Sequence, residues 1–339
     1  MPVIAPSPQQ WDAFVRAHPR AHALQYAAWG ELKGAYGWAF ERVALLEDDR
    51  ITAGGQLLYR RLPFRLGWLA YVGMGPFVTD NRQWPALWSA LDAAAKRRGA
   101  AFLKWEPGLY LTEPPPDIAA MGFRPSPQTI QPPRTVVLDI STDDENILAR
   151  MNQGTRRKIR QSLKNGITYR QASTAEVSRF TGMMQTTGTR NAFGVHAPDY
   201  YQMAYHLFVP EQAALFLAEH EGDPLAGVMV FAAGDCAQYL YGASSDVKRT
   251  LMGSYGVQWA AIQWAKARGC RWYDLWGIPD EDEIVLEAQF ETRSDGLWGV
   301  YGFKRGWGGR VVRSAGAWDR VYNPLIYAAY RLALSRRES

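Results

Sequence analysis

The chain has 339 residues, 47% of them hydrophobic, and this length accommodates two domains with sizeable cores. With two cysteines, no apolar run approaching about 18 residues and no leader pattern, the sequence predicts no disulfide framework, membrane span or secretory signal, and indicates a cytoplasmic protein. The formal net charge is +5, and residues 146–170 hold seven Lys and Arg but no acid. That stretch favours a polyanionic partner, with a solvated basic face as the alternative.

The first half of the chain predicts two helices, a β-hairpin and a strand–helix–strand unit. Ser7 and Pro8 suit the start of a helix over Ser7–Ala17, and Gly34 suits the end of another over Gln25–Gly34. The turn Asp48–Arg50 between two apolar runs is typical of a hairpin. The other predicted elements here are the strands Phe40–Glu47, Ile51–Arg60, Trp68–Gly73 and Phe102–Glu106 and the helix Trp84–Arg98.

The second half predicts helices first and then the same order of strands. After a strand over Val136–Ile140, the expected helices are Asp143–Lys164, Val177–Thr187 and Asp199–Leu207. A hairpin, an aromatic strand through Tyr241, a helix ending at Gly269 and a strand over Tyr273–Trp276 follow. The remaining predicted elements are the hairpin strands Ala214–His220 and Leu225–Ala232, a closing strand over Leu297–Lys304 and a final helix over Tyr322–Ser335.

The two halves correspond without a gap over the aromatic strand and the helix behind it. A shift of 170 residues places Tyr71 on Tyr241 and Gly99 on Gly269. A repeat of this length indicates a duplicated domain rather than a solenoid unit. The mixed alternation of strands and helices predicts an α/β fold. We place one domain at 1–140 plus 310–339 and the other at 141–309.

This order resembles the GNAT acyltransferase fold, so we expect two GNAT-like domains in tandem. In that superfamily the loop between strand and helix offers backbone N–H groups to the pyrophosphate of acetyl-CoA. Here the nearest frame, Thr250–Tyr255, places an aromatic ring where the family has a small residue. The corresponding first loop, Asp80–Trp84, has no glycine. We therefore expect that neither domain retains acetyl-CoA.

Four stretches on this duplicated fold carry a more specific resemblance, and they are Gln25–Trp38, Met151–Ile167, Met183–Tyr201 and Gly296–Gly309. In this order they resemble the Fem family of peptidoglycan interpeptide-bridge aminoacyltransferases. The chain has no heptad stretch for the coiled-coil arm of some members, so it resembles the armless members, which the family connects with adding a first residue.

The reaction implied by this resemblance moves Gly, Ala or Ser from aminoacyl-tRNA to the side-chain amine of the stem-peptide diamino acid. The ester is already activated, so no metal, cofactor or covalent intermediate is expected, and His18 and His22 are separated by Pro19 rather than spaced as ligands. The resemblance assigns Lys304 to the developing oxyanion and Phe303 to stacking on the terminal adenine of tRNA. We expect Lys304 to end a strand beside glycines that let a ligand approach. A solvated lysine and a core phenylalanine are the structural alternative.

The acceptor carries a pyrophosphate, which needs cations. By resemblance, Lys33 and Arg190 are assigned to it, with Tyr241 and its repeat partner Tyr71 lining the site. Lys33 also suits the last turn of its helix for structural reasons alone. Asp80 is a second catalytic candidate, for the acceptor amine, unless it only caps the next helix.

The remaining basic cluster, Arg156, Arg157 and Lys158, is assigned either to tRNA phosphates or to the domain interface. The expected partners are aminoacyl-tRNA and a UDP-MurNAc-pentapeptide or lipid-linked precursor, with peripheral contact to the inner membrane face, and the protein is expected to be a monomer. Three alternatives stay open. They are transfer to a protein N-terminus or another small amine, an ordinary acetyl-CoA transferase, and a non-catalytic tRNA- or membrane-binding module.

Overall fold

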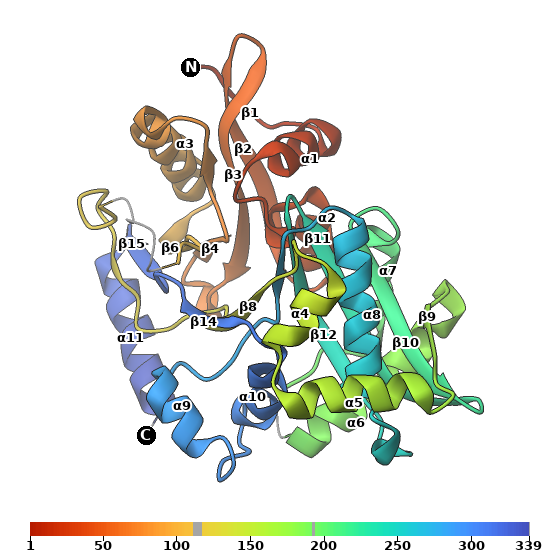
Figure 1. Ribbon diagram of the computed structural model, residues 1–339. Helices are drawn as coiled ribbons and strands as arrows, with labels where there is room; N and C mark the ends of the chain where they lie inside the picture. The colour runs from red at the N-terminus through yellow and green to blue at the C-terminus, as the bar shows by residue number, and fades with distance from the viewer. Residues whose placement is uncertain (111–116, 192–193, 339) are drawn as a thin grey trace. The chain divides into compact units, whose positions relative to one another are not determined.

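The computed structural model describes residues 1–110, 117–191 and 194–338 and forms two compact units (Figure 1). Residues 1–133 and the chain from 313 onward make unit 1, and residues 134–312 make unit 2. The fold is mixed α/β in both. The strand β8 (Arg134–Asp139) lies in the sheet of unit 2, although the predicted first domain, 1–140, includes it. None of the described helices is long and apolar enough to cross a bilayer.

Unit 1 is built on a sheet with strand order β1-β2-β3-β4-β6-β15-β7, and β5 pairs with β3. Only β4 and β6 run parallel among the paired strands of this sheet that the structure describes. The strands are β1 (Val3–Ile4), β2 (Ala39–Glu47), β3 (Arg50–Arg61), β4 (Trp68–Gly73), β5 (Phe77–Val78), β6 (Ala100–Glu106), β7 (Arg124–Pro125) and β15 (Trp318–Val321).

The helices of unit 1 begin where the sequence supplies caps. Ser7 accepts a hydrogen bond from Gln10 N at the start of the first helix, which buries Trp11 and Val15. The final helix begins at Pro324, a favoured first position, two residues after the predicted start. The helices are α1 (Pro8–Ala17), α2 (Ala27–Ala35), α3 (Trp84–Arg97) and α11 (Pro324–Glu338), with short 3₁₀ turns η1 (Ala23–Gln25), η2 (Pro63–Arg65) and η3 (Asn81–Gln83).

Unit 2 contains a sheet of order β14-β8-β13-β12-β11-β10-β9, in which β12 and β13 form the parallel pair. The strands are β9 (Thr168–Gln171), β10 (Ala213–His220), β11 (Asp223–Ala233), β12 (Cys236–Ser244), β13 (Trp272–Asp274) and β14 (Arg310–Arg313), besides β8. The helices are α4 (Asp144–Arg150), α5 (Gln153–Lys164), α6 (Val177–Asn191), α7 (Pro198–Phe208), α8 (Gly253–Ala267), α9 (Glu283–Gln289) and α10 (Trp298–Lys304), with η4 (Thr174–Glu176), η5 (Arg249–Leu251) and η6 (Arg305–Trp307).

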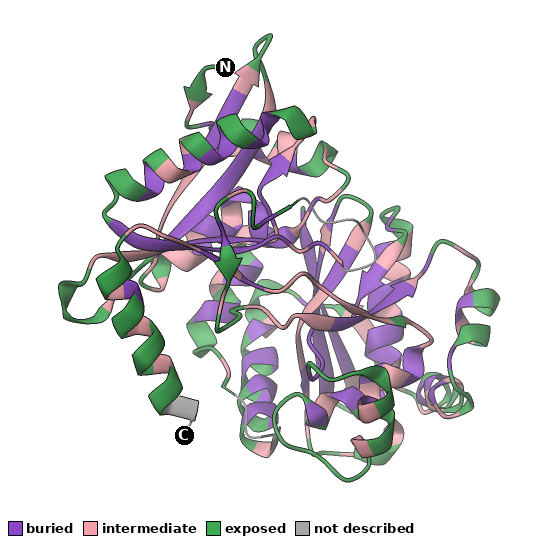
Figure 2. Ribbon diagram, turned by 90° about the vertical axis from the view of Figure 1, so that its left-hand side faces the viewer, coloured by how far each residue is buried: buried purple, intermediate pink, exposed green. Residues whose placement is uncertain are grey.

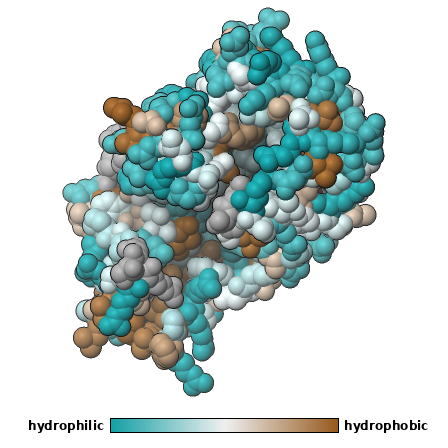
Figure 3. Space-filling view, turned by 90° about the horizontal axis from the view of Figure 1, so that it is seen from below, coloured by the Kyte–Doolittle hydropathy of each residue, from teal (hydrophilic) through white to brown (hydrophobic). Residues whose placement is uncertain are grey.

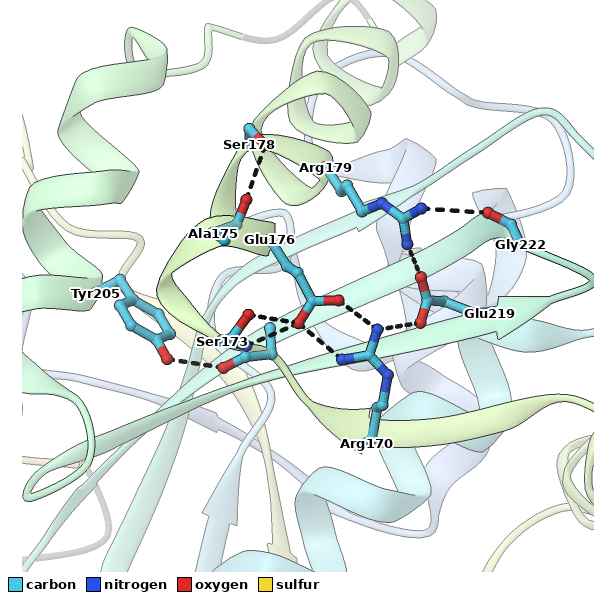
Figure 4. A network of polar contacts seen from close by, with 10 residues as sticks. Arg170, Ser173, Ala175, Glu176, Ser178, Arg179, Tyr205, Glu219 and Gly222 are labelled. Atoms are coloured by element: carbon cyan, nitrogen blue, oxygen red, sulfur yellow. Dashed lines mark hydrogen bonds and ion pairs between the residues drawn. The ribbon is translucent and has the colours of Figure 1, made fainter.

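The strands of both sheets are largely buried (Figure 2). In unit 2 the side chains between the sheet and α8 form one hydrophobic core, which also takes in α10 through Trp298 and Tyr301. At the edge of this sheet, an ion network joins β9 to η4, α6 and β10 (Figure 4). Arg170 pairs with Glu176 and Glu219, and Arg179 also pairs with Glu219. This network anchors the short edge strand.

Two predicted elements are wrong. The single helix over Asp143–Lys164 is two helices, because Asn152 has extended backbone and its side chain accepts from Thr155 N at 2.7 Å, which starts α5 afresh. The strand over Leu297–Lys304 is the helix α10. Trp298, Tyr301 and Lys304 are buried at a spacing of three residues, which is a helical face.

Candidate functional site

The strands β12 and β13 separate after a short parallel pairing, and Lys304 lies at the point where they separate. The pairing ends at Gln238 and Asp274. Lys304, the last residue of α10, is buried there, and its Nζ donates to Gly277 O at 2.7 Å and to Trp276 O at 3.2 Å. An ammonium group has three N–H donors, so these carbonyls leave one for a ligand.

Backbone geometry directs these carbonyls towards the amine. Trp276 has φ +61°, a conformation that a bulky residue seldom adopts, and its N–H donates to Asp274 Oδ1 at 2.7 Å. The described residues provide no carboxylate within ion-pair distance of Lys304. Burial lowers the pKa of Lys304 to about 7, against a smaller opposing effect of Asp274. The side chain can therefore gain or lose a proton near neutral pH.

A β-bulge at Leu240 places the two tyrosines of β12 on opposite faces of the sheet. Tyr241 pairs with Met229 while Tyr239 pairs with the next residue, Val230, so Leu240 has no partner. The Tyr239 ring faces the core side, with its centroid 5.8 Å from Lys304 Nζ. Tyr241 faces α7 instead.

The second half of β12 packs against α6 and α7 through Tyr241, which belongs to the strand, and through Arg190, which belongs to α6. The Tyr241 hydroxyl lies 3.2 Å from that of Tyr200, and burial raises the pKa of Tyr241. Arg190 donates to Ser244 Oγ at 2.7 Å and pairs with Asp246 at 2.7 Å. An exposed imidazole, His196, stacks on Tyr200 with centroids 3.8 Å apart. Of the predicted acceptor residues of unit 2, Tyr241 thus lies in β12, and Arg190 of α6 contacts the end of that strand.

Two of the predicted tRNA residues, Phe303 and Lys158, meet at Tyr255. The Phe303 ring packs edge-on against Tyr255 with centroids 5.1 Å apart, and Trp307 stacks on Tyr255 at 6.0 Å. Lys158 Nζ donates to the Tyr255 hydroxyl at 3.1 Å and lies 4.9 Å from its ring centroid. This aromatic cluster, formed by Tyr255, Phe303 and Trp307, adjoins Lys304 in sequence and carries a cation at its edge.

The neighbouring arginines on α5 differ from each other. Arg156 donates to Met151 O at 2.5 Å and so caps the C-terminus of α4. Arg157 is exposed and lines a surface groove along α5. The described residues that line this groove include no acid and are Gln153, Gly154, Arg156, Arg157, Arg160, Gln161, Lys164 and Asn165.

The glycines near Lys304 and in the first turn of α8 serve packing, in contrast to the expected ligand approach beside Lys304. A Cβ on Gly306 would collide with Thr155 Oγ1, and one on Gly308, which has φ +75°, would collide with Arg150 O. A Cβ on Gly256 would collide with the Tyr169 hydroxyl. Tyr255 itself is half-buried between Lys158 of α5 and Phe303 of α10.

In unit 1, Lys33 and Tyr71 are linked through Trp38 and Arg60. Lys33 lies in the last turn of α2, with Nζ 4.8 Å from the Trp29 ring centroid. Arg60 lies over Trp38 at 5.4 Å, and the Trp38 ring contacts Tyr71 at 6.3 Å. Burial and then the charge of Arg60 lower the pKa of Lys33 to about 8. An anion between the two cations would relieve that repulsion.

Tyr71 belongs to a buried network at the ends of β4 and β6. Its hydroxyl donates to Glu106 Oε2 at 2.5 Å and accepts from Gln131 Nε2 at 3.3 Å. Glu106 also accepts from the backbone N–H groups of Ile130 and Gln131. Burial raises the pKa of Glu106 in spite of these donors.

Asp80 lies apart from this network and caps η3. Its side chain accepts from Arg82 N at 2.8 Å and pairs with the Arg82 guanidinium, which keeps the pKa of Asp80 low, at about 2. The geometry therefore favours the capping role over the catalytic one. Sequence reasoning missed Arg60, Glu106 and Tyr255 as partners, although an acid at the end of the apolar strand before Pro107 was a visible signal.

Known proteins and a family model match this chain over nearly its whole length. The FemAB family model matches residues 7–121, 119–223 and 219–335. The chain belongs to the FemAB family. A similar curated FemAB relative is a lipid II:glycine glycyltransferase of Staphylococcus saprophyticus, 28% identical over 94% of this chain and 92% of the relative. The protein of that name from Staphylococcus aureus is 26% identical over the same shares. The aligned 397 residues of the first exceed the 339 of this chain, so that relative has segments that this chain lacks.

Solved structures confirm the fold. The crystal structure of FemX matches with a TM-score of 0.87 at 24% identity and covers 97% of this chain and 99% of FemX. A tandem GNAT protein from the clavulanic acid biosynthesis pathway matches with a TM-score of 0.54 at 14% identity, covering 94% and 97%. The predicted fold, two GNAT-like domains in tandem, is therefore confirmed for this FemAB chain.

Proposed function

We propose that this FemAB protein transfers an aminoacyl group from aminoacyl-tRNA to the side-chain amine of the stem-peptide diamino acid in a peptidoglycan precursor. The observation that carries the proposal is Lys304, a buried amine with one free donor where β12 and β13 separate, next in sequence to Phe303. The glycyltransferase names of the relatives support the same class of reaction.

The chemistry needs only a positioned amine and stabilisation of negative charge. The neutral amine of the acceptor attacks the ester carbonyl, a C–N bond forms, the ester C–O bond breaks, and the tRNA hydroxyl leaves with a proton. Protonated Lys304 donates its free N–H to the tetrahedral oxyanion. Since its pKa is about 7, it can also pass a proton to the leaving oxygen.

The tRNA end is assigned to the aromatic cluster and the groove along α5. Phe303, with Tyr255 beneath it, offers a stacking surface for the terminal adenine. Lys158 and Arg157 provide charge for phosphates, while Arg156 serves mainly to hold α4. The Tyr255 side chain in the first turn of α8, in contact with Lys158 and Phe303, speaks against acetyl-CoA as donor.

Two sets of residues, each within one unit, are candidates for binding the acceptor. In unit 1, Lys33 and Arg60 are suited to a phosphate, with Tyr71 behind them. In unit 2, Arg190 and Tyr241 line β12. Asp80 is not required in this scheme.

The test combines the purified protein with tRNAs charged with labelled Gly, Ala or Ser and with either a nucleotide-linked or a lipid-linked pentapeptide precursor. Mass spectrometry should detect one added residue on at least one precursor, and uncharged tRNA should give none. Product on only one precursor identifies the acceptor. If folded protein modifies neither precursor with any of the three donors, the proposed reaction is wrong, and protein N-termini become the next acceptor to examine.

A further inference from the structure

The turn between β3 and β4 exposes an aromatic side chain, and both the exposure and the backbone conformation of that residue are unfavourable for the stability of the fold. Phe64 is 93% exposed at the tip of this turn. Leu66 N donates to Pro63 O at 3.2 Å, and both central residues, Phe64 and Arg65, have positive φ, +55° and +58°. Turns of this type normally use Asn and Gly. A phenylalanine here gains nothing from burial and has an unfavourable backbone conformation.

Arginines and a tryptophan surround the base of the same turn. Arg61 and Arg98 lie over the Trp68 ring, at 5.1 Å and 4.8 Å from its centroid. Together with Arg65 they are exposed, and the ion pairs among the described residues include none of the three. Tryptophan beside exposed arginine is typical of the interfacial zone of a bilayer.

The helix α11 extends this surface. Its inner side packs on β6 through Tyr327 and Tyr330, and Leu62 at the base of the turn packs into the same small core. On its outer side, Leu325 is 83% exposed and Leu332 is 55% exposed. Figure 2 shows most of this helix, beside the label C, as exposed. Exposed Arg331 and Arg336 lie among the outer apolar residues.

Exposed apolar side chains elsewhere in the protein are not always surrounded by basic residues. Ile284 in α9 is 85% exposed, but its neighbours in sequence are the acids of 280–283. On the face shown in Figure 3, hydrophilic residues predominate and hydrophobic residues form separate patches. An anionic surface would attract the turn and α11 and repel the surroundings of Ile284.

We propose that the β3–β4 turn and the outer side of α11 form a docking surface for an anionic phospholipid bilayer. Phe64, Leu325 and Leu332 insert at the boundary between headgroups and acyl chains, and the arginines contact lipid phosphates. The proposal deepens the proposed function, on which its purpose rests, because it brings the enzyme to the surface where a lipid-linked acceptor resides. Exposed apolar side chains with a basic rim fit a lipid surface better than tRNA, which requires a groove or a stacking pocket.

The test measures binding of the full chain to vesicles without tRNA or precursor, so its outcome does not depend on the proposed reaction. Vesicles of phosphatidylcholine alone are compared with vesicles containing phosphatidylglycerol, by co-sedimentation. Phe64→Asn suits the positive φ and should keep or raise the melting temperature, while vesicle affinity falls about tenfold. Arg65→Glu should lower affinity about fivefold or more. Ile284→Asn, the matched control, should leave affinity unchanged.

Equal binding to both kinds of vesicle, or binding that Phe64→Asn and Arg65→Glu leave intact, would overturn the proposal. So would a loss of tRNA affinity in these two variants with vesicle binding kept, because the surface would then be a nucleic-acid site. In the transfer assay, Phe64→Asn should slow reaction with precursor embedded in vesicles and leave reaction with the nucleotide-linked precursor unchanged. A double variant, Leu325→Ser with Leu332→Ser, provides an independent check of α11.

Discussion

Both units contain a parallel strand pair joined by a helix, β4–α3–β6 in unit 1 and β12–α8–β13 in unit 2. The shift of 170 residues that aligns Tyr71 with Tyr241 also aligns Glu106 with Trp276. In unit 1 the strand ends are filled by the Glu106 carboxylate and its hydrogen-bond donors. In unit 2 the residue at the same place has a strained backbone and offers its carbonyl to Lys304. The two units share this scaffold, but a glutamate of β6 fills the strand ends of unit 1 and a lysine of α10 fills those of unit 2.

This difference suggests that the two strand ends have different tasks. The carboxylate oxygens of Glu106 accept hydrogen bonds from groups within the protein, so its task is structural. Lys304 is buried and has one N–H donor without a hydrogen-bond acceptor, which lowers the stability of the fold. A role of that N–H group in a reaction would explain why it is there. The following predictions test this contrast, from the largest expected effect to the smallest.

Removing the carboxylate from unit 1 should affect stability. Glu106→Ala leaves the Tyr71 hydroxyl and two backbone N–H groups without their buried acceptor, so the free energy of unfolding should fall by about 3 kcal/mol. Glu106→Gln retains one acceptor oxygen and should lose about 1 kcal/mol. Urea unfolding measures both. If the alanine variant is as stable as the glutamine variant, the network does not hold the strand ends.

Removing the amine from unit 2 should affect the pH dependence of stability. Burial lowers the pKa of Lys304 to about 7 from 10.5, so between these values the unfolded chain binds more protons than the folded chain. The free energy of unfolding therefore rises with pH through that window, and the penalty is full below pH 7. Lys304→Met should thus stabilise the protein strongly at pH 6 and much less at pH 10. A difference between variant and parent that is independent of pH would exclude a lowered pKa.

The aromatic cluster should contribute to the tRNA side of unit 2 alone. Phe303→Ala removes a stacking surface and should weaken binding of aminoacyl-tRNA about tenfold, within the range of about 1–3 kcal/mol for one stacked base. Phe290→Ala is the matched control, because that ring also packs against the core and lies under Arg305, 4.0 Å from its centroid. Equal losses in the two variants would indicate a general packing effect, and filter binding measures both.

The smallest effect is expected on α5. Arg157→Gln should reduce tRNA affinity about threefold and reduce the slope of log affinity against log salt by about one, since one phosphate contact is lost. Arg156→Gln should instead lower the melting temperature, because it uncaps α4. A salt slope that neither substitution changes would move the tRNA site away from this groove.

Local patterns in the sequence were sufficient for most elements and for the repeat. The strand β4 begins and ends where predicted, at Trp68 and Gly73, because aromatic and β-branched residues stand between turn signals. The segment Leu297–Lys304, rich in glycine and aromatic residues, fits both a strand pattern and a helix pattern. The packing of Trp298 and Tyr301 on the core favours the helix α10, and this packing cannot be seen in the local sequence.

The sequence predicts individual residues of the candidate site, but it does not predict which of them contact one another. Family resemblance supplied Lys304, Phe303 and Lys158, but the meeting of the last two at Tyr255 depends on α5 packing against α8, far apart in sequence. Likewise the carbonyl partners of Lys304 follow from a positive φ at Trp276, for which a tryptophan gives no local signal.

The most direct test of the central claim is single-turnover transfer from charged tRNA by Lys304→Met, with Arg305→Met as the neighbouring control. Arg305 pairs with Glu287 at the surface and has no assigned part in the reaction. We predict that Lys304→Met lowers the transfer rate by about 10²–10³-fold, as loss of an oxyanion donor does, while precursor and tRNA affinities stay within about twofold. A rate within threefold of the parent protein, or an equal loss in the Arg305 variant, would contradict the role of Lys304 at the strand ends of unit 2.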